Sequence, residues 1–142
     1  WPRSRSTFSR RVALNKVMGT GTQRSFTGAS WEKQVGYCRA IRRGDLVWVT
    51  GTVSLDDEGQ PFAVGDPEAQ ARRCLDIIAK ALAEVGASMS DVVRTRMFVT
   101  DIDHWEAFGR AHGDVFRDHP PATTMVDISR NTSPWSAIPD RD

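Results

Sequence analysis

The segment from Asp66 to Gly86 constrains the fold more than any other stretch of the sequence. Asp66 is a favoured helix-capping residue, Pro67 suits the first turn of a helix, and Gly86 suits the left-handed position that follows a last turn. Between these signals, apolar residues recur at spacings of three and four: Cys74, Ile77, Ile78, Ala81, Leu82 and Val85. This pattern predicts one long amphipathic helix whose apolar stripe lies in the core and not in a cofactor site.

Two runs of β-branched and aromatic residues precede this helix. Residues 36–42 and 46–53 each predict a strand, and the short link Arg43-Gly44-Asp45 between them indicates a β-hairpin. In the second run, the alternate residues on both faces are apolar, which favours a sheet that is covered on both sides. Ser30 to Lys33 predicts a turn or a short capped segment ahead of the hairpin.

After the long helix, residues 92–100 and 122–128 predict two further strands. A second helix is predicted over residues 105–116, and Asp103 is expected to cap it. Its apolar face is expected to carry Trp105, Phe108, His112 and Val115.

The predicted order is strand, strand, helix, strand, helix, strand, an α+β arrangement. Right-handed crossovers place both helices on one face of a sheet, which leaves the other face bare. In a chain of 142 residues, the simplest cover for that face is another copy of the chain. We therefore expect one α+β domain that assembles with itself.

Composition excludes some classes of function. The net charge of +1 gives the whole molecule no strong attraction to nucleic acid or to anionic membranes. No apolar run approaches the roughly 18 residues of a membrane span. Cys38 and Cys74 lack metal-ligand neighbours and favour a reducing compartment, so we expect a cytoplasmic protein.

Both ends of the sequence differ from its middle. Residues 1–31 contain no Asp or Glu but six Lys or Arg, a bias compatible with a disordered tail, a transit peptide or a nucleic-acid arm. We expect a basic disordered extension over 1–23, a domain over 24–129 whose folded part begins near Phe26, and an irregular tail over 130–142, which contains two prolines.

Few residues show a catalytic spacing. His104, His112 and His119 do not form a metal set; His112 is expected to be half-buried on a helix, and the other two are expected to be exposed. Nucleophile-elbow and phosphate-loop motifs are absent from the sequence. Tyr37 and Arg39 share a strand face, where they form either a small-carboxylate site or a solvated strand edge.

Five blocks of sequence, taken in order, carry a family resemblance. They are Gly36-Tyr37-Cys38-Arg39-Ala40, Gly44 to Thr52, Gln70 to Ala83, Val92 to Asp101, and Pro121-Ala122-Thr123-Thr124-Met125-Val126. Together they resemble the RidA/YjgF-like proteins (reactive intermediate deaminases, also called endoribonuclease L-PSP-like). The last block is similar to the P-A-R-x-x-V signature of that family.

This resemblance implies a chorismate-mutase-like α+β fold and a homotrimer with ligand clefts between subunits. Active members hydrolyse enamines and imines, such as 2-aminoacrylate, to ammonia and a 2-keto acid without a metal or an organic cofactor. An arginine clamps the substrate carboxylate, and a glutamate on the last strand helps to place the water. The implied partners are the chain itself and a small carboxylate or imine, with no membrane and no expected nucleic acid.

Residue by residue, the resemblance assigns a substrate-binding set. Tyr37 matches the cleft tyrosine, Gly51 matches a glycine that lets the ligand approach, and Asp103 falls where many members have Asn. Thr123 stands in place of the signature arginine, and Arg39 is the best replacement because it shares the face of Tyr37.

The last strand and its glutamate are not recognisable in residues 131–142. The sequence thus predicts either a Rid-like deaminase or a trimer that binds a metabolite without turnover; RNA binding through the basic arm is a third reading.

Overall fold

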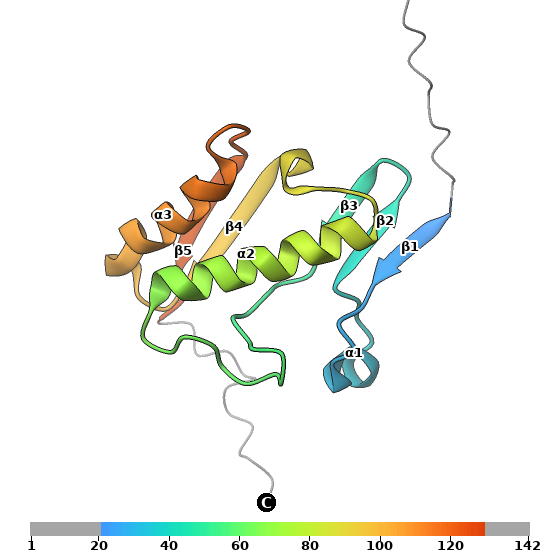
Figure 1. Cartoon of the computed structure of the whole chain (residues 1–142), viewed down its shortest axis with the longest axis horizontal. Helices are drawn as coiled ribbons and strands as arrows, with labels where there is room; N and C mark the ends of the chain where they lie inside the picture. The colour runs from blue at the N-terminus through green and yellow to red at the C-terminus, as the bar shows by residue number, and fades with distance from the viewer. Residues whose placement is uncertain (1–20, 130–142) are drawn as a thin grey trace, which may run out of the picture.

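The computed structural model describes residues 21–129, which form an α+β domain (Figure 1). Its strands are β1 (Thr22–Ser25), β2 (Ala40–Arg43), β3 (Leu46–Val49), β4 (Arg94–Val99) and β5 (Ala122–Asp127). Its helices are α1 (Ser30–Val35), α2 (Pro67–Glu84) and α3 (Trp105–Phe116), with short 3₁₀ turns η1 (Met89–Asp91) and η2 (Ile102–His104). From β2 onward, the predicted order of strands and helices is confirmed.

The described strands form two sheets, where the resemblance implied one. β1, β2 and β3 are antiparallel, and Arg43 pairs with Leu46 across the predicted hairpin turn. β4 and β5 form a separate parallel pair, with Arg94 opposite Ala122. Figure 1 shows α2 and α3 on the same side of these strands, as predicted, with α2 lying across both sheets.

Local signals set the ends of α2 as predicted. The Asp66 carboxylate accepts a hydrogen bond from the Ala69 N–H at 3.0 Å, and Pro67 is the first helical residue. Gly86 follows the helix with φ of 71°, a left-handed conformation that a residue with a side chain rarely adopts.

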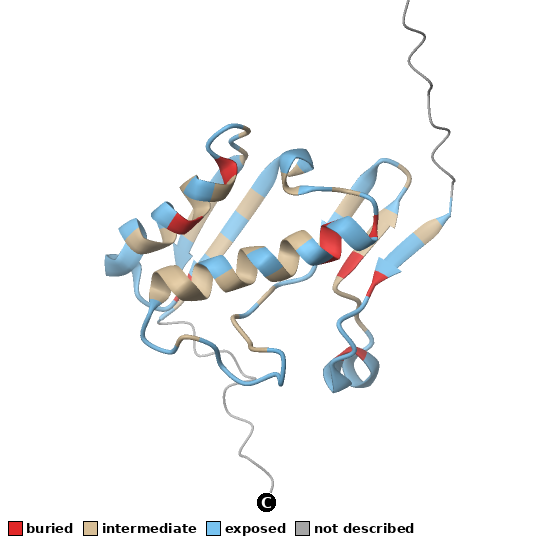
Figure 2. Ribbon diagram, in the orientation of Figure 1, coloured by how far each residue is buried: buried red, intermediate tan, exposed pale blue. Residues whose placement is uncertain are grey.

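The apolar stripe of α2 is buried at one end only (Figure 2). Ala81 and Val85 form the core with Ala40 of β2, and the half-buried Val47 and Val49 of β3 pack against them. Farther toward the helix N-terminus, the side chains of the same stripe are only half-buried: Cys74, Ile77 and Ile78. The core is therefore complete over the β1–β3 sheet and incomplete along the rest of α2.

The N-terminal region differs from the prediction because α1 is a true helix. β1 already begins at Thr22, ahead of the expected start near Phe26. The Glu32 carboxylate, 4% exposed, accepts hydrogen bonds from both donors of Thr27 and from the Gly28 N–H. Burial alone would raise the pKa of Glu32, but these bonds outweigh it and hold the pKa below its ordinary value.

Both strands of the predicted hairpin are shorter than expected. Gly36 ends α1 in a left-handed conformation and donates to the Glu32 carbonyl, so the first strand begins at Ala40 and not at residue 36. The second strand ends at Val49, and the following residues turn toward α2. There the Arg73 Nε–H donates to the Leu55 carbonyl at 2.6 Å.

The predicted bounds of α3 are confirmed, but the predicted cap is wrong. His104 occupies the cap position without a side-chain bond, and Asp101 instead accepts from the Asp103 N–H at 3.1 Å in η2. Asp101 takes this role because a carboxylate readily bonds the backbone two residues ahead. The buried residues of α3 are Ala111 and Phe116, whereas Trp105, expected on the apolar face, is exposed.

Candidate functional site

Arg39, Tyr37 and Gly51 come together at one end of the β1–β3 sheet, and we call them the Arg39 cluster. The Arg39 guanidinium carbon lies 5.7 Å from the centre of the Tyr37 ring. The Arg39 Nη1 donates to the Gly51 carbonyl at 2.9 Å and to Thr52 Oγ1 at 3.3 Å. A cation over an aromatic face and a bond to a carbonyl both restrict the guanidinium.

The backbone holds Arg39 in place although it precedes β2. The Arg39 N–H donates to the Ser25 carbonyl at 2.9 Å, and the Thr50 N–H donates to the Arg39 carbonyl at 3.0 Å. These bonds extend the antiparallel ladder one residue beyond the strand ends on both sides. The guanidinium is therefore carried on a paired backbone, which is more rigid than a free loop.

Arg39 also has a donor left over. Its Nε is buried and has no hydrogen-bond partner among the described residues. An unsatisfied buried donor costs about 1–3 kcal/mol, so an acceptor that reaches it is favoured. Nη1 is already engaged and Nε is enclosed, so a carboxylate reaches the Nε and Nη2 side of the guanidinium only when the side chain turns toward it.

Space around Gly51 is open within one chain. A Cβ built on this glycine would meet no other atom within 4 Å, and its φ is not in the left-handed region. The space beside the Arg39 cluster is thus available to a ligand or to another subunit.

The other two residues of the predicted set lie elsewhere. Asp103 is exposed in η2, just beyond the carboxyl end of β4, whereas Thr123 lies near the start of β5. Because β4 and β5 are parallel, these positions are at opposite ends of the β4–β5 pair. One chain therefore unites three of the five predicted residues and separates the remaining two.

Thr123 takes part in a polar cluster beneath α3 that sequence reasoning missed. Its Oγ1 lies 2.9 Å from Thr95 Oγ1 of β4, and the Thr95 hydroxyl lies 3.0 Å from the His112 Nε2. His112 is half-buried, as predicted, and its ring centre is 4.5 Å from that of Phe116. The signal that could have revealed this cluster is Thr95, a polar residue on the side of β4 that otherwise carries apolar residues toward the helices.

This surrounding makes His112 sensitive to pH, because burial lowers its pKa below 6.5. The folded chain then binds fewer protons than the unfolded chain, so stability falls as pH drops through the ordinary value. We expect the melting temperature to fall between about pH 7.5 and about pH 5.5, and His112→Gln to reduce that fall. His104→Gln, which changes an exposed histidine, is the control. An unchanged pH dependence in His112→Gln would contradict this assignment.

Other reactive groups carry no comparable arrangement. Among the described residues, no three His, Cys, Asp or Glu side chains are grouped so that they could hold a metal ion. Cys38 and Cys74 are both free, and burial raises the pKa of the Cys74 thiol, which disfavours its thiolate. None of the helices in residues 21–129 is long and apolar enough to cross a bilayer.

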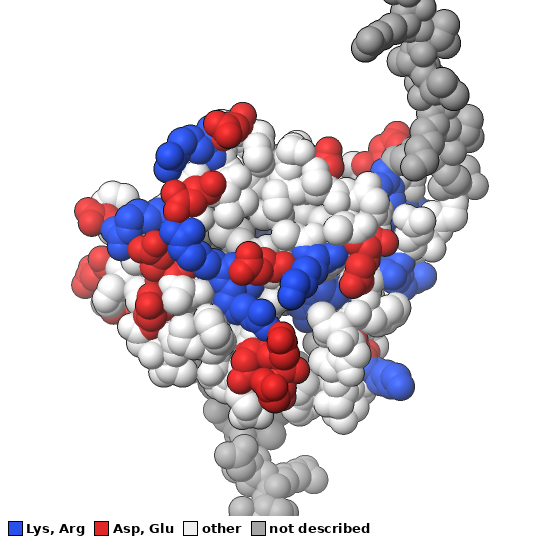
Figure 3. Space-filling model, in the orientation of Figure 1, with Lys and Arg blue, Asp and Glu red and all other residues white. Residues whose placement is uncertain are grey.

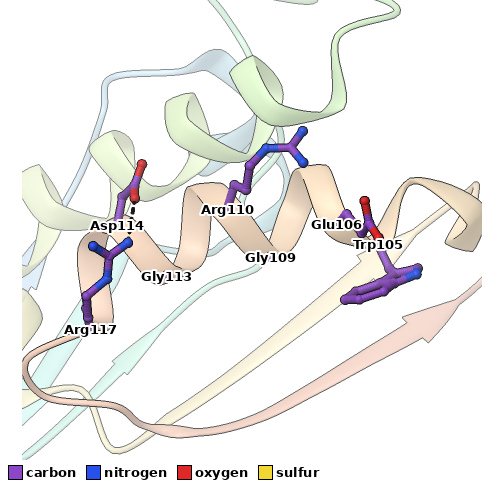
Figure 4. Close-up of a pocket in the computed structure, with 7 residues that line it drawn as sticks. All are labelled: Trp105, Glu106, Gly109, Arg110, Gly113, Asp114 and Arg117. Carbon is purple, nitrogen blue, oxygen red and sulfur yellow. Dashed lines mark hydrogen bonds and ion pairs between the residues drawn. The ribbon is translucent and has the colours of Figure 1, made fainter.

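A shallow hollow of about 500 Å³ lies along α3 (Figure 4), and no residue of the Arg39 cluster lines it. It is lined by Trp105, Glu106, Gly109, Arg110, Gly113, Asp114 and Arg117. Three of its four charged side chains are already paired: Arg110 with Glu68 of α2 at 2.8 Å, and Asp114 with Arg117 at 3.1 Å. Neutralised charges on a wide, open surface favour a structural role, so we do not place the site here.

The two faces of the molecule differ in polarity. Figure 3 shows positive and negative side chains interspersed over the helices, where Arg72 pairs with both Glu68 and Asp114. On the strands, Val47 and Val49 face α2, so the alternate residues Leu46 and Trp48 face the opposite side and are 61% and 53% exposed. Phe98 of β4, 62% exposed, alternates in the same way with the buried Val99. An exposed apolar sheet face marks an interaction surface.

Comparison with known proteins decides the family. Residues 27–135 match the family described as endoribonuclease L-PSP. The chain belongs to this family of RidA/YjgF-like proteins. A RutC family protein of Sulfurisphaera tokodaii is 33% identical to this RidA/YjgF-like chain over 99 residues, which are 69% of the chain and 79% of that relative.

Two further relatives extend the comparison. A protein named 3-aminoacrylate deaminase RutC, from Acinetobacter baylyi, is 29% identical over 65% of the chain and 73% of that relative. The crystal structure of Rv2704 of Mycobacterium tuberculosis, described as a YjgF/YER057c/UK114 family member, superposes with a TM-score of 0.69 at 38% identity. It covers 80% of the chain and 90% of Rv2704, so the predicted fold class of this RidA/YjgF-like chain is confirmed.

Proposed function

We propose that the chain is a Rid-like hydrolase, a deaminase of small enamines or imines that carry a carboxylate. In this reaction water adds to the imine carbon and the carbon–nitrogen bond breaks. The products are ammonia and a 2-keto acid. Two findings support the proposal: membership of the family, and the similarity to a relative named 3-aminoacrylate deaminase. The observation that carries it is the Arg39 cluster, with an anchored guanidinium and an unsatisfied donor.

Each residue of the cluster has a proposed role. The free fork of Arg39 grips the substrate carboxylate, and the Tyr37 hydroxyl adds a donor beside it. Gly51 leaves room for the substrate against the end of the sheet, because a Cβ built there meets no other atom of the described residues within 4 Å. These groups bind and orient the substrate so that water can reach the imine carbon.

We further propose that three chains assemble, with the cleft between neighbouring subunits. The exposed apolar side chains of β3 and β4 support this, since burying them stabilises an assembly. The separation of Thr123 and Asp103 in one chain supports it too. In a trimer, either residue from a neighbouring subunit can complete the cluster built around Arg39.

The experiment that tests the activity is ammonia release from 2-aminoacrylate generated in the assay, followed by a panel of related imino acids. We expect the purified chain to raise the rate above the spontaneous reaction. An unchanged rate for every substrate would reject the deaminase.

The alternative is a trimer that binds a small carboxylate without turning it over, and Thr123 in place of the signature arginine favours it. In that case pyruvate, 2-oxobutyrate or benzoate would raise the melting temperature of the protein, and no product would form. A gain together with catalysed ammonia release would instead support the deaminase.

Replacing Thr123 with arginine tests the same position directly. If Thr123 lines the cleft, the Thr123→Arg variant gains a charge-assisted contact with the substrate carboxylate, worth about 1.5–3 kcal/mol. We expect kcat/KM for 2-aminoacrylate to rise about 10-fold or more, or in the binding alternative Kd to fall by that factor. Thr124→Arg is the matched control, because Thr124 bonds Arg94 and not the Thr123 cluster. Equal effects of both substitutions would contradict a cleft position for Thr123.

A further inference from the structure

Alternation along the strands separates the residues that face the helices from those that point away from them. Thr95 of β4 and Thr123 of β5 lie 3.0 and 3.5 Å from the His112 Nε2 of α3, so both mark the helix-facing side of their strands. The alternate residues Arg94 and Arg96 of β4 therefore lie on the opposite side, which we call the outer strand face. Both arginines are exposed in a single chain.

The outer strand face has no carboxylate from the strands to balance its arginines. In the β1–β3 sheet it also includes Arg24 and Arg43, because Ser25 bonds α2 and Ala40 packs against α2, which places the alternate residues outside. Asp127 is the only acidic residue of the described strands, and alternation places it on the helix-facing side of β5. Four strand arginines and no strand carboxylate therefore share this face.

The arginines on or next to the helices, by contrast, are balanced. Four of them each pair with a carboxylate at 3.1 Å or less: Arg72, Arg73, Arg110 and Arg117. Neither Arg94 nor Arg96 has such a partner in residues 21–129. Both lie on the same side of β4 as Phe98, which the proposed trimer buries. Burying charges without a counter-charge opposes assembly, so this face needs an added negative group.

Arg94, Arg96 and Thr124 are arranged so that they can hold one anion. Thr124 lies opposite Arg96 in the parallel pairing of β4 with β5. The Arg94 Nη2 donates to Thr124 Oγ1 at 2.7 Å, which directs the Arg94 guanidinium toward the same point. Since the Thr124 oxygen accepts this bond, its own hydroxyl hydrogen remains a donor. Two guanidinium groups and a hydroxyl thus offer several donors to the oxygens of a tetrahedral anion.

We propose that Arg94, Arg96 and Thr124 bind an oxoanion of the phosphate class between copies of the chain in the proposed trimer, on which this inference rests. Copies that associate through the outer strand face cover their arginines, where like charges repel and ions lose their hydration. The oxoanion supplies the missing negative charge and accepts hydrogen bonds from the guanidinium groups. Anion binding and assembly are therefore coupled, and each favours the other.

The aliphatic residues of the outer strand face favour another copy of the chain over a nucleic acid, which also carries phosphates. Leu46 is 61% exposed and Val126 is 40% exposed, and aliphatic side chains lack the ring faces on which bases stack. The net charge of +1 adds no general attraction to nucleic acid. A small anion between copies satisfies both the charge of the arginines and the apolar character of the face.

The test measures the mass of the full chain by light scattering, over a dilution series that spans its dissociation. The series is run in phosphate buffer and in chloride buffer of equal ionic strength. We expect phosphate to lower the chain concentration of half-dissociation about tenfold. That factor corresponds to one anion per trimer at about 100 times its Kd, because the half-dissociation concentration varies as the square root of the trimer dissociation constant.

A pair of double variants separates this site from a general effect of phosphate, which strengthens apolar contacts in many proteins. Arg94→Gln with Arg96→Gln should reduce the response to about twofold or less. In chloride it should assemble more readily than the unmodified chain, which also shows that it is folded. Arg24→Gln with Arg43→Gln removes the same charge from the outer strand face of the other sheet and should retain the response.

Three results would overturn the proposal. One is an equal half-dissociation concentration of the unmodified chain in phosphate and in chloride. Another is a response that Arg94→Gln with Arg96→Gln leaves unchanged. The third is binding of a single-stranded oligonucleotide by single chains that depends on Arg94 and Arg96, because the face would then serve a nucleic acid. Ammonia release is measured separately, so the first two results leave the proposed deaminase and its trimer standing, whereas a chain that stays single in both buffers removes the trimer as well.

Discussion

Arg39→Ala is expected to lower kcat/KM for 2-aminoacrylate about 10- to 100-fold in initial-rate measurements of ammonia release. The substitution removes the only guanidinium of the Arg39 cluster and with it a charge-assisted, bidentate contact worth about 1.5–3 kcal/mol. It also leaves the Gly51 carbonyl without the Nη1 donor that it now accepts from at 2.9 Å. In the binding alternative, the same variant loses the gain in melting temperature that pyruvate produces.

Two control variants distinguish a loss of carboxylate binding from a general loss of folding or activity. Arg43→Ala removes an exposed arginine from β2, the strand that directly follows Arg39, and should leave kcat/KM unchanged. Arg39→Lys retains a positive charge without the planar fork, so its rate should fall between those of the unmodified chain and Arg39→Ala. If Arg39→Ala matches Arg43→Ala in rate and in ligand-induced melting shift, Arg39 does not hold the carboxylate.

The elements that sequence predicted well are those whose signals are local. α2 begins at Pro67 because Asp66 caps it, and Gly86 takes the left-handed position after it. The hairpin turn follows from Gly44-Asp45 in the same way. In each case a few adjacent residues determine the backbone, and no distant contact competes with them.

The errors arose where two local signals competed or where distant segments decide. Asp103 is a residue type that favours helix caps. Asp101, two residues earlier, instead accepts the hydrogen bond from the Asp103 N–H in the turn before α3. Gly36 fits the start of a strand by pattern, yet it ends α1 because Glu32 anchors that helix. The division of the strands into two sheets depends on pairing between distant segments, which no local pattern specifies.

The residues of the candidate site show the same difference between local signals and contacts that depend on distant segments. Tyr37 and Arg39 lie close together as predicted, although the structure places both ahead of β2 and not on a strand, and Arg39 bonds the Gly51 carbonyl. The position of Thr123, beneath α3 and next to Thr95, depends on how β5 pairs with β4. Spacing within one segment gave no means of predicting that contact.

Phe98→Asp is expected to convert the proposed trimer into single chains. Phe98 is 62% exposed on the sheet face that points away from the helices, where Arg94 and Arg96 of the same strand also lie, and burying a side chain of this kind contributes about 1.5–3 kcal/mol. Summed over three copies, its loss costs roughly 5–9 kcal/mol of assembly free energy, and three buried carboxylates add to that cost. Light scattering at micromolar concentration should give the mass of one chain for this variant and of three for the unmodified protein.

Val64→Asp is the control for this change, because Val64 is also a highly exposed apolar residue but lies in the loop before α2 and not on the sheet. It should leave the proposed trimer intact. If the cleft forms between subunits, Phe98→Asp should also lose ammonia release although Arg39 is unchanged, whereas Val64→Asp should retain it. A single-chain mass for the unmodified protein would exclude the trimer, and full activity in a single-chain Phe98→Asp variant would place the whole site within one subunit.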